Sequence, residues 1–237
     1  MNSSAKRVKL SQNFLTDKNV LKRIEDTLLD LEGKRILEIG GGDGRISEII
    51  VSKKPEKLVV LELDKKYFEI LKERFSKNEN VKILNTSCLD YKIKEEITVS
   101  SIPYSLTKEI FKKVVESESI KTGYFIVQKE FQEKLVKKLF VPISIYVNIF
   151  FEVQNLFNIK KNSFSPAPKV DSSLILISRK KDYGKKYKKL WDFLNFLTQN
   201  RNRNMNKFFK DKDNKKIYTI SYEEILKIYA DEYIRSY

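Results

Sequence analysis

Hydrophobic and polar positions follow two different periods along the first 180 residues of the chain. Short apolar runs typical of buried strands occur at 35–39, 57–62, 81–84, 97–100, 124–127, 144–153 and 174–177. Between the earlier runs, apolar residues recur at helical spacing, which predicts helices over 20–31 and beginning near residues 46, 64 and 106. Strands that alternate with helices predict an α/β fold with a parallel, doubly wound sheet.

The ends of the first helix carry their own signals. Thr16 and Asp17 precede it, and either side chain could cap its first turn by accepting hydrogen bonds from free backbone N–H groups. Gly33 follows it, and we expect the helix to end there.

A glycine-rich bend at 37–47 (LEIGGGDGRIS) lies between the first long strand and the next helix, and it holds four of the chain's seven glycines. Glycine lets the backbone approach a ligand closely, and the N–H groups at the start of a helix are free to donate. Such a bend is typical of sites for a dinucleotide or for S-adenosylmethionine, and the bend alone does not decide between them. Glu62, at the end of the second strand, favours S-adenosylmethionine because one carboxylate matches two ribose hydroxyls, although strand-end acids are common in α/β folds.

Beyond residue 180 the pattern changes to helices with dense positive charge, which predicts a Rossmann-like domain over 1–180 and a small basic helical domain over 181–237. From Arg179 onward there are 16 Lys and Arg against 8 Asp and Glu, a net charge of +8 in a chain whose total is +15. An excess of this size favours a polyanionic partner, nucleic acid above all, over the alternative of a lysine-rich solvated surface.

Composition excludes several classes of site. The chain has no histidine and a single cysteine, so histidine-based triads, an internal disulfide and a histidine-ligated metal are ruled out. No apolar stretch reaches signal-peptide or membrane-spanning length. We therefore expect a cytoplasmic monomer with no metal and no membrane contact.

The fourth strand ends in Ser101, Ile102, Pro103 and Tyr104, and this SIPY sequence resembles the (Asn/Asp/Ser)-X-Pro-(Tyr/Phe) motif of amino-directed methyltransferases. The exocyclic amine of adenine is conjugated with its ring and is a weak nucleophile. Hydrogen-bond acceptors around its N–H groups make its lone pair available for attack, and an aromatic side chain stacks on the flipped base.

Five motifs in order resemble the rRNA adenine dimethyltransferase family: QNFL at 12–15, EIGGGDG at 38–44, ELD at 62–64, SIPY at 101–104 and FSPAPKVDSS at 164–173. The resemblance implies a Rossmann-like methyltransferase sheet with S-adenosylmethionine as cofactor. It also implies methylation of the N6 amines of two adjacent adenosines in small-subunit rRNA during ribosome biogenesis, with the immature small subunit as partner.

The resemblance assigns three sets of residues. Those expected at the target adenine are Ser101, Ile102, Pro103, Tyr104 and Phe164. Those expected at the cofactor are Gln12, Asn13, Leu15, Gly40, Gly42, Glu62, Leu63, Ser87, Cys88 and Ser101. Those expected to contact RNA are Lys169, Arg201, Arg203, Lys207 and Lys210, because cationic side chains pair with phosphates.

Two positions depart from the family pattern. Ser101 stands where the family usually has Asn, and Ser87 stands where it usually has an Asp that binds the cofactor's adenine, a contact that Asp90 could take over. These departures leave open the alternative that the chain is a non-catalytic RNA-binding assembly factor. Two further alternatives remain: a large-subunit rRNA methylase, which shares the same motifs, and a nicotinamide-dependent oxidoreductase, which shares only the glycine bend.

Overall fold

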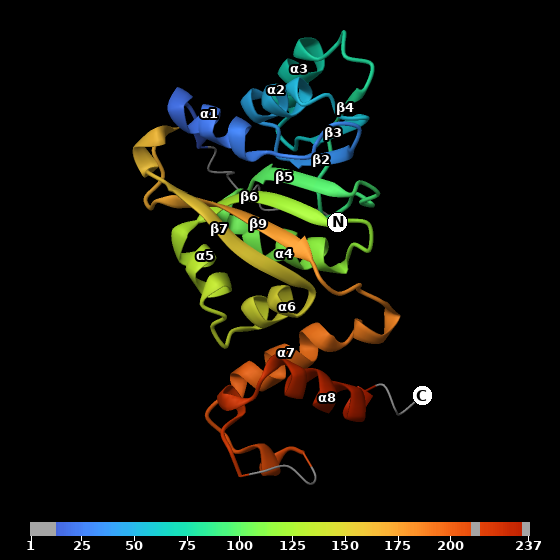
Figure 1. Ribbon diagram of the computed structural model, residues 1–237, viewed down its shortest axis with the longest axis vertical. Helices are drawn as coiled ribbons and strands as arrows, with labels where there is room; N and C mark the ends of the chain where they lie inside the picture. Colours follow the sequence, from blue (N-terminus) through green and yellow to red (C-terminus); the bar gives the residue numbers. More distant parts are fainter. Residues whose placement is uncertain (1–12, 210–213, 234–237) are drawn as a thin grey trace, which may run out of the picture.

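A seven-stranded sheet forms the centre of the molecule in the computed structural model, which describes residues 13–209 and 214–233 (Figure 1). Its strands, in spatial order, are β4 (Val81–Leu84), β3 (Lys57–Leu61), β2 (Arg35–Ile39), β5 (Ile97–Ser101), β6 (Thr122–Gln128), β9 (Ser172–Arg179) and β7 (Phe151–Ile159). A separate two-stranded sheet pairs β1 (Phe14–Leu15) with β8 (Phe164–Ser165). The expected α/β architecture is confirmed.

The sheet is mixed, so the prediction of a parallel, doubly wound sheet is wrong for the part that contains β9. The strands from β4 to β6 run parallel, whereas β9 is antiparallel to both of its neighbours, β6 and β7. The reason is the short connection between β7 and β9: residues 160–171 include no crossover helix, and a parallel pair would need one.

The expected strand over 144–153 is also wrong in its first part. Residues Pro142–Phe150 form helix α6, and β7 begins only at Phe151. Every residue of α6 from Ile143 onward is buried, so its apolar run has no polar face to reveal the helical period. Pro142 at the first turn was the available signal, because proline is favoured at the start of a helix.

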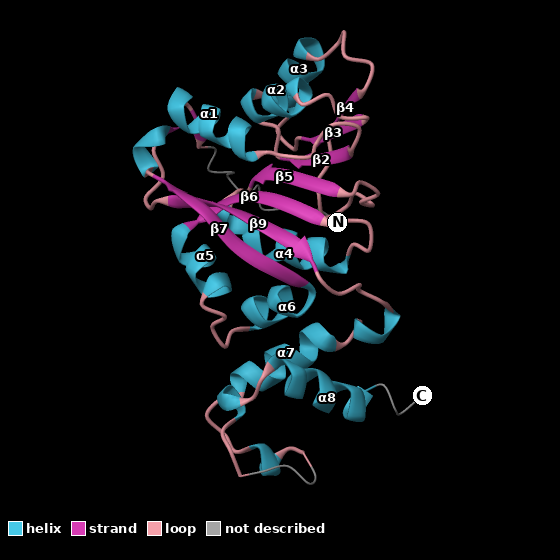
Figure 2. Cartoon of the chain, in the orientation of Figure 1, coloured by secondary structure: helices cyan, strands magenta, loops and turns pink. Residues whose placement is uncertain are grey.

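Helices cover both faces of the sheet (Figure 2). They are α1 (Lys18–Thr27), α2 (Arg45–Ser52), α3 (Lys65–Arg74), α4 (Thr107–Glu116), α5 (Lys129–Val136) and α6. Successive strand residues alternate between two buried clusters: Leu58 belongs to the cluster that includes residues of α1, α2 and α3, whereas Val59 belongs to the one that includes residues of α4, α5 and α6. This alternation places one cluster on each face of the sheet.

The first helix is capped as expected, but it ends earlier than predicted. Asp17 is the cap, with Oδ1 accepting from the N–H groups of Asn19 at 2.9 Å and Val20 at 3.3 Å. The helix ends at Thr27, and Asp30 turns the chain with a positive φ of 56°. Gly33 therefore does not end the helix; it lies in the turn before β2.

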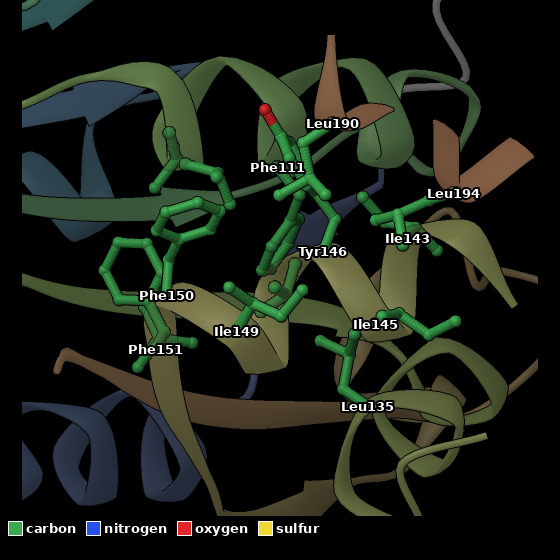
Figure 3. Packing of buried hydrophobic residues seen from close by; sticks show 14 of the residues in the cluster. Phe111, Leu135, Ile143, Ile145, Tyr146, Ile149, Phe150, Phe151, Leu190 and Leu194 are labelled. Carbon is green, nitrogen blue, oxygen red and sulfur yellow. The ribbon is translucent and has the colours of Figure 1, made fainter. Parts of the chain in front are cut away.

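The C-terminal region is helical, with α7 (Leu190–Gln199) and α8 (Tyr222–Tyr233) as its main elements. Short 3₁₀ turns complete the chain at η1 (Tyr104–Leu106), η2 (Lys161–Ser163), η3 (Lys185–Tyr187), η4 (Met205–Lys207) and η5 (Ile217–Thr219). Figure 3 shows Tyr146 and other side chains of α6 gathered with Leu190 and Leu194 of α7 in one buried cluster. The helical region thus shares a core with the sheet, and the domain boundary at residue 180 stays a prediction.

Within the described ranges, none of the helices combines the length and the apolar character needed to cross a bilayer.

Candidate active site

One pocket opens at the carboxyl ends of the central parallel strands, where α/β sheets commonly bind ligands. All the predicted cofactor and adenine residues that the structure describes line it: Asn13, Leu15, Gly40, Gly42, Glu62, Leu63, Ser87, Cys88, Ser101, Ile102, Pro103, Tyr104 and Phe164. Gln12, the remaining member of these two sets, lies outside the described residues. The fold therefore brings five separated motifs to a single cavity.

The glycine bend forms one wall of this pocket. Gly42 has a φ of +54°, a left-handed conformation that favours glycine. Gly41 is restricted by space instead, because a Cβ there would lie 2.4 Å from Cγ1 of Val60. The bend is tied to its neighbours by the Gly40 N–H, which donates to the Leu61 carbonyl at 2.8 Å.

Glu62 holds the bend in place and is itself almost fully buried, at 5% exposure. Its Oε2 accepts from the Gly42 N–H and its Oε1 from the Asp64 N–H, both at 2.8 Å. Each carboxylate oxygen has a second lone pair, so both could still accept from a ligand in the pocket. Glu62 thus shapes the bend as well as facing the cavity.

Glu38 is a second buried carboxyl group on this wall, and sequence analysis did not assign it a role. It is 1% exposed and accepts a hydrogen bond from the Ser47 hydroxyl. Burial raises the pKa of Glu38 to about 8, and the nearby charges of Glu62 and Asp43 add to this rise. At neutral pH the side chain is therefore mostly uncharged. An acid inside an otherwise apolar strand was the signal for such a group.

The opposite wall begins where β5 ends. The Ile102 N–H donates to the Ile126 carbonyl at 3.2 Å, which continues the β5–β6 pairing and leaves the Ile102 carbonyl without a donor among the described residues. No partner for the Ser101 hydroxyl is found among the described residues either. Two oxygen acceptors in a row therefore border the pocket next to the Tyr104 ring.

Tyr104 and Phe164 supply the aromatic rings of this wall. The Tyr104 hydroxyl lies 2.7 Å from the Ser172 Oγ, at the start of β9. Phe164 is buried in β8, where it pairs with Leu15 of β1. The pairing of β1 with β8 thus brings Phe14, Leu15 and Phe164 together at the pocket.

Phe14 was not predicted as a site residue, yet it lines the pocket. Its ring centroid lies 5.0 Å from that of Tyr67, and a Cβ on Gly42 would lie 3.2 Å from its Cε1. Phe14 therefore packs on the glycine bend from the β1 side. Nothing in the sequence distinguishes a pocket position from an ordinary core position here, since a lone aromatic residue fits both.

The loop after β4 holds the two polar residues expected to contact the cofactor's adenine, Ser87 or Asp90 in its place. Ser87 lines the pocket, whereas Asp90 is exposed and is not part of the lining. Cys88 also lines the pocket, and burial raises the pKa of its thiol to about 11, so the thiol stays protonated. Among the described residues, no three cysteine or acidic side chains are grouped in a way that would hold a metal ion.

The residues predicted to contact RNA lie outside the pocket. Lys169, Arg201, Arg203 and Lys207 are exposed, and Lys210 is outside the described residues. The carbonyl groups of Arg201 and Arg203 accept from the N–H groups of Tyr218 at 3.1 Å and Ile217 at 3.0 Å. Two adjacent chain segments therefore fix the backbone of both arginines while their side chains face solvent.

The family model for ribosomal RNA adenine dimethylase matches residues 3–234. Ribosomal RNA small subunit methyltransferase A of Malacoplasma penetrans is 32% identical over 198 residues, covering 79% of this chain and 68% of its own. The protein of the same name from Mycoplasmopsis pulmonis is 32% identical over 220 residues, covering 86% of this chain and 84% of its own.

Solved structures agree on the fold. A dimethyladenosine transferase from Plasmodium falciparum superposes with a TM-score of 0.79 at 17% identity, covering 91% of this chain and 95% of that one. The 23S rRNA methyltransferase ErmE superposes with a TM-score of 0.72 at 20% identity, covering 92% and 98%. The resemblance drawn from the five motifs is confirmed: the chain belongs to the ribosomal RNA adenine dimethylase family.

Proposed function

We propose that this chain transfers methyl groups from S-adenosylmethionine to the N6 amines of two adjacent adenosines in small-subunit rRNA. The observation that carries the proposal is the single pocket in which the glycine bend and Glu62 face Ser101–Tyr104 and Phe164. Family membership supports the reaction. The names of the relatives support the small subunit over the large one.

The residues on the glycine side fit S-adenosylmethionine. Glu62 offers two carboxylate oxygens for the two ribose hydroxyls, and Gly40 and Gly42 leave space for close approach of the amino-acid and ribose parts. Leu63, Ser87, Asn13 and Leu15 line the same pocket. We assign Leu63 and Ser87 to the cofactor's adenine ring, and Asn13 and Leu15 to its methionine end. When bound, the cofactor supplies an electrophilic methyl group.

The residues on the other side are suited to hold an extruded adenine. Tyr104 and Phe164 offer aromatic faces for stacking. The Ser101 hydroxyl and the Ile102 carbonyl accept from the N6 amine, which directs its lone pair away from those bonds and toward the glycine wall. The methylated nitrogen is acidic enough to lose its proton to water, so the absence of histidine is no obstacle.

The serines at 87 and 101 motivated a non-catalytic assembly factor as the alternative. Both side chains line the pocket, and each hydroxyl oxygen retains the ability to accept a hydrogen bond. The relatives' names describe methyltransferases, which also favours the enzyme. We therefore retain catalysis as the proposal.

RNA contact outside the pocket belongs to the same proposal. Lys169 lies in the loop next to Phe164, and Arg201, Arg203 and Lys207 are exposed on the C-terminal region. Their charge fits phosphate groups, and we assign them to positioning the RNA and not to the transfer itself.

The test is incubation of the protein with labelled S-adenosylmethionine and immature small ribosomal subunits, followed by mass analysis of the nucleosides. We expect N6,N6-dimethyladenosine among the nucleosides and two adjacent copies of it in one RNase fragment, with mature large subunits unlabelled in a parallel reaction. Cofactor binding without any methylated nucleoside would support the assembly factor instead. Label in the large subunit alone would assign the chain to the other branch of the fold.

A further inference from the structure

Tyr104 is held at both ends of its side chain. Its backbone follows Pro103 and begins η1, and its hydroxyl lies 2.7 Å from the Ser172 Oγ. Ser172 has no exposed surface and is not part of the pocket lining. The serine therefore reaches the phenol from behind the pocket, where it would touch the ring but not a bound base.

The sheet keeps Ser172 fixed. It is the first residue of β9, where it pairs with Gln128 of β6 on one side and with Ile159 of β7 on the other. The preceding residue, Asp171, accepts at its carbonyl from the Lys129 N–H at 3.0 Å. The Ser172 Oγ is thus carried by a central strand and not by the loop over 164–171.

We infer that Ser172 is a positioning residue for adenine methylation, holding the Tyr104 ring in place before the target base enters. The inference rests on the proposed function, in which this ring stacks on the base. A ring that is already fixed loses little rotamer freedom when a base binds, so more of the stacking energy goes into holding the amine in line. Ser172 acts only through Tyr104 and touches no reacting atom.

The chain provides a matched control in the next residue. Ser173 is buried to the same degree as Ser172, and its Oγ donates to the Asn158 side-chain oxygen at 2.8 Å. Ser173→Ala removes one buried serine hydroxyl from the same strand without involving Tyr104. It therefore reports the general cost of such a change to the sheet.

The kinetic experiment compares Ser172→Ala, Tyr104→Phe, their double variant and Ser173→Ala on immature small subunits. We expect each of the first two to lower kcat/KM about threefold to tenfold, the size of one neutral hydrogen bond, with unchanged affinity for S-adenosylmethionine. The double variant should be no slower than the slower single variant, because both changes remove the same bond. Ser173→Ala should match the wild type.

Three kinetic results would overturn the inference. They are wild-type kcat/KM for Ser172→Ala, equal losses for Ser172→Ala and Ser173→Ala, and losses that multiply in the double variant. Thermal unfolding of each variant separates loss of the bond from loss of the fold.

A second readout does not depend on methylation. With ¹³C-labelled tyrosine, the Tyr104 ring signals are identified as those missing from the Tyr104→Phe spectrum, among the chain's 12 tyrosines. In Ser172→Ala we expect these signals to shift and to average over several ring orientations, whereas in Ser173→Ala they should stay unchanged. An unchanged Tyr104 signal in Ser172→Ala contradicts the anchoring. If the signals respond as expected but the wild type methylates no RNA, the proposed function fails while the anchoring by Ser172 stands.

Discussion

The two walls of the pocket are built in different ways. The glycine wall, residues 40–44 with Glu62, is held by backbone groups and carboxylates that are close in sequence; the Gly42 N–H and Glu62 are 20 residues apart. The tyrosine wall, Ser101–Tyr104 with Phe164, depends on partners far along the chain. Tyr104 and Ser172 are 68 residues apart, and Thr16 and Ser163, which hold the N-terminal segment to this wall, are 147 apart.

Because the walls are built differently, we expect substitutions in each wall to impair a different step. The glycine wall has a backbone shape that one acid maintains, so damage there should affect cofactor binding first. The tyrosine wall consists of side chains set on an already formed sheet, so damage there should affect turnover and leave cofactor binding nearly intact. The variants below test this division, beginning with the largest expected effect.

Glu62→Gln should give the largest effect, weakening S-adenosylmethionine binding by about a hundredfold. The amide keeps the size of the side chain but has only one acceptor oxygen, so either the Gly42 N–H or the Asp64 N–H then faces an NH₂ group. The charged acceptor for the ribose hydroxyls is lost as well. Titration calorimetry measures the change, with Glu56→Gln as the control because Glu56 is exposed and outside the pocket. Unchanged affinity would contradict both the ribose contact and the role of Glu62 in shaping the bend.

Tyr104→Ala should lower kcat by about thirtyfold while the dissociation constant for S-adenosylmethionine changes less than twofold. Loss of base stacking is worth about 1 to 3 kcal/mol, and the substitution leaves the glycine wall untouched. Single-turnover methylation measures the chemical step, and calorimetry measures the cofactor. Tyr104→Phe keeps the ring and should lose much less. Equal losses in kcat and cofactor affinity for Tyr104→Ala would mean that the two walls are not separate.

Glu38→Gln tests, through the pH dependence of stability, whether the buried Glu38 carboxyl group beside the glycine wall keeps its proton. Burial raises the pKa of Glu38 to about 8, above its unfolded value, so the folded state holds a proton that the unfolded state has released. The resulting stability is complete below the unfolded pKa and is lost as the pH rises through about 8. From about pH 5 to 8 we expect the wild type to lose up to about 1.4 kcal/mol of unfolding free energy per pH unit from this group.

The glutamine cannot titrate, and its oxygen can still accept from Ser47, so the variant should show a flatter dependence over the same range. Urea unfolding at several pH values measures both slopes. If the unfolding free energies of the wild type and the variant change with pH in parallel, the pKa of Glu38 in the folded state is not raised.

Much of the glycine wall was predictable from the sequence, because its signals are local. The strand β2, the glycines and Glu62 follow one another in one βαβ unit, and all the predicted residues of this unit line the pocket. Glu38 was the exception: an acid inside an apolar strand was a local signal for a buried carboxyl group, but its hydrogen bond from Ser47 is seen only in the fold.

The tyrosine wall was predictable as a motif but not as a structure. SIPY and Phe164 were found by resemblance, whereas the partner of Tyr104 was not, since Ser172 is one of two consecutive serines with nothing to distinguish them in the sequence. The distinction arises from the antiparallel placement of β9 between β6 and β7, which the parallel-sheet prediction missed. Helix α6 was missed for a separate reason: its uniform burial left no polar face to show the helical period.

The smallest effects should come from the exposed arginines, which belong to neither wall. Arg201→Ala and Arg203→Ala should each reduce the slope of log affinity against log salt for RNA by about 1, with kcat at saturating RNA and cofactor affinity unchanged. Filter binding at several salt concentrations measures the slope. Lys72→Ala is the control, because Lys72 is an exposed cation on α3, at the opposite end of the molecule from residues 200–209 (Figure 1). An equal change for Lys72 would mean that RNA binding responds to total charge, whereas a loss of kcat in the arginine variants would tie the C-terminal region to the tyrosine wall.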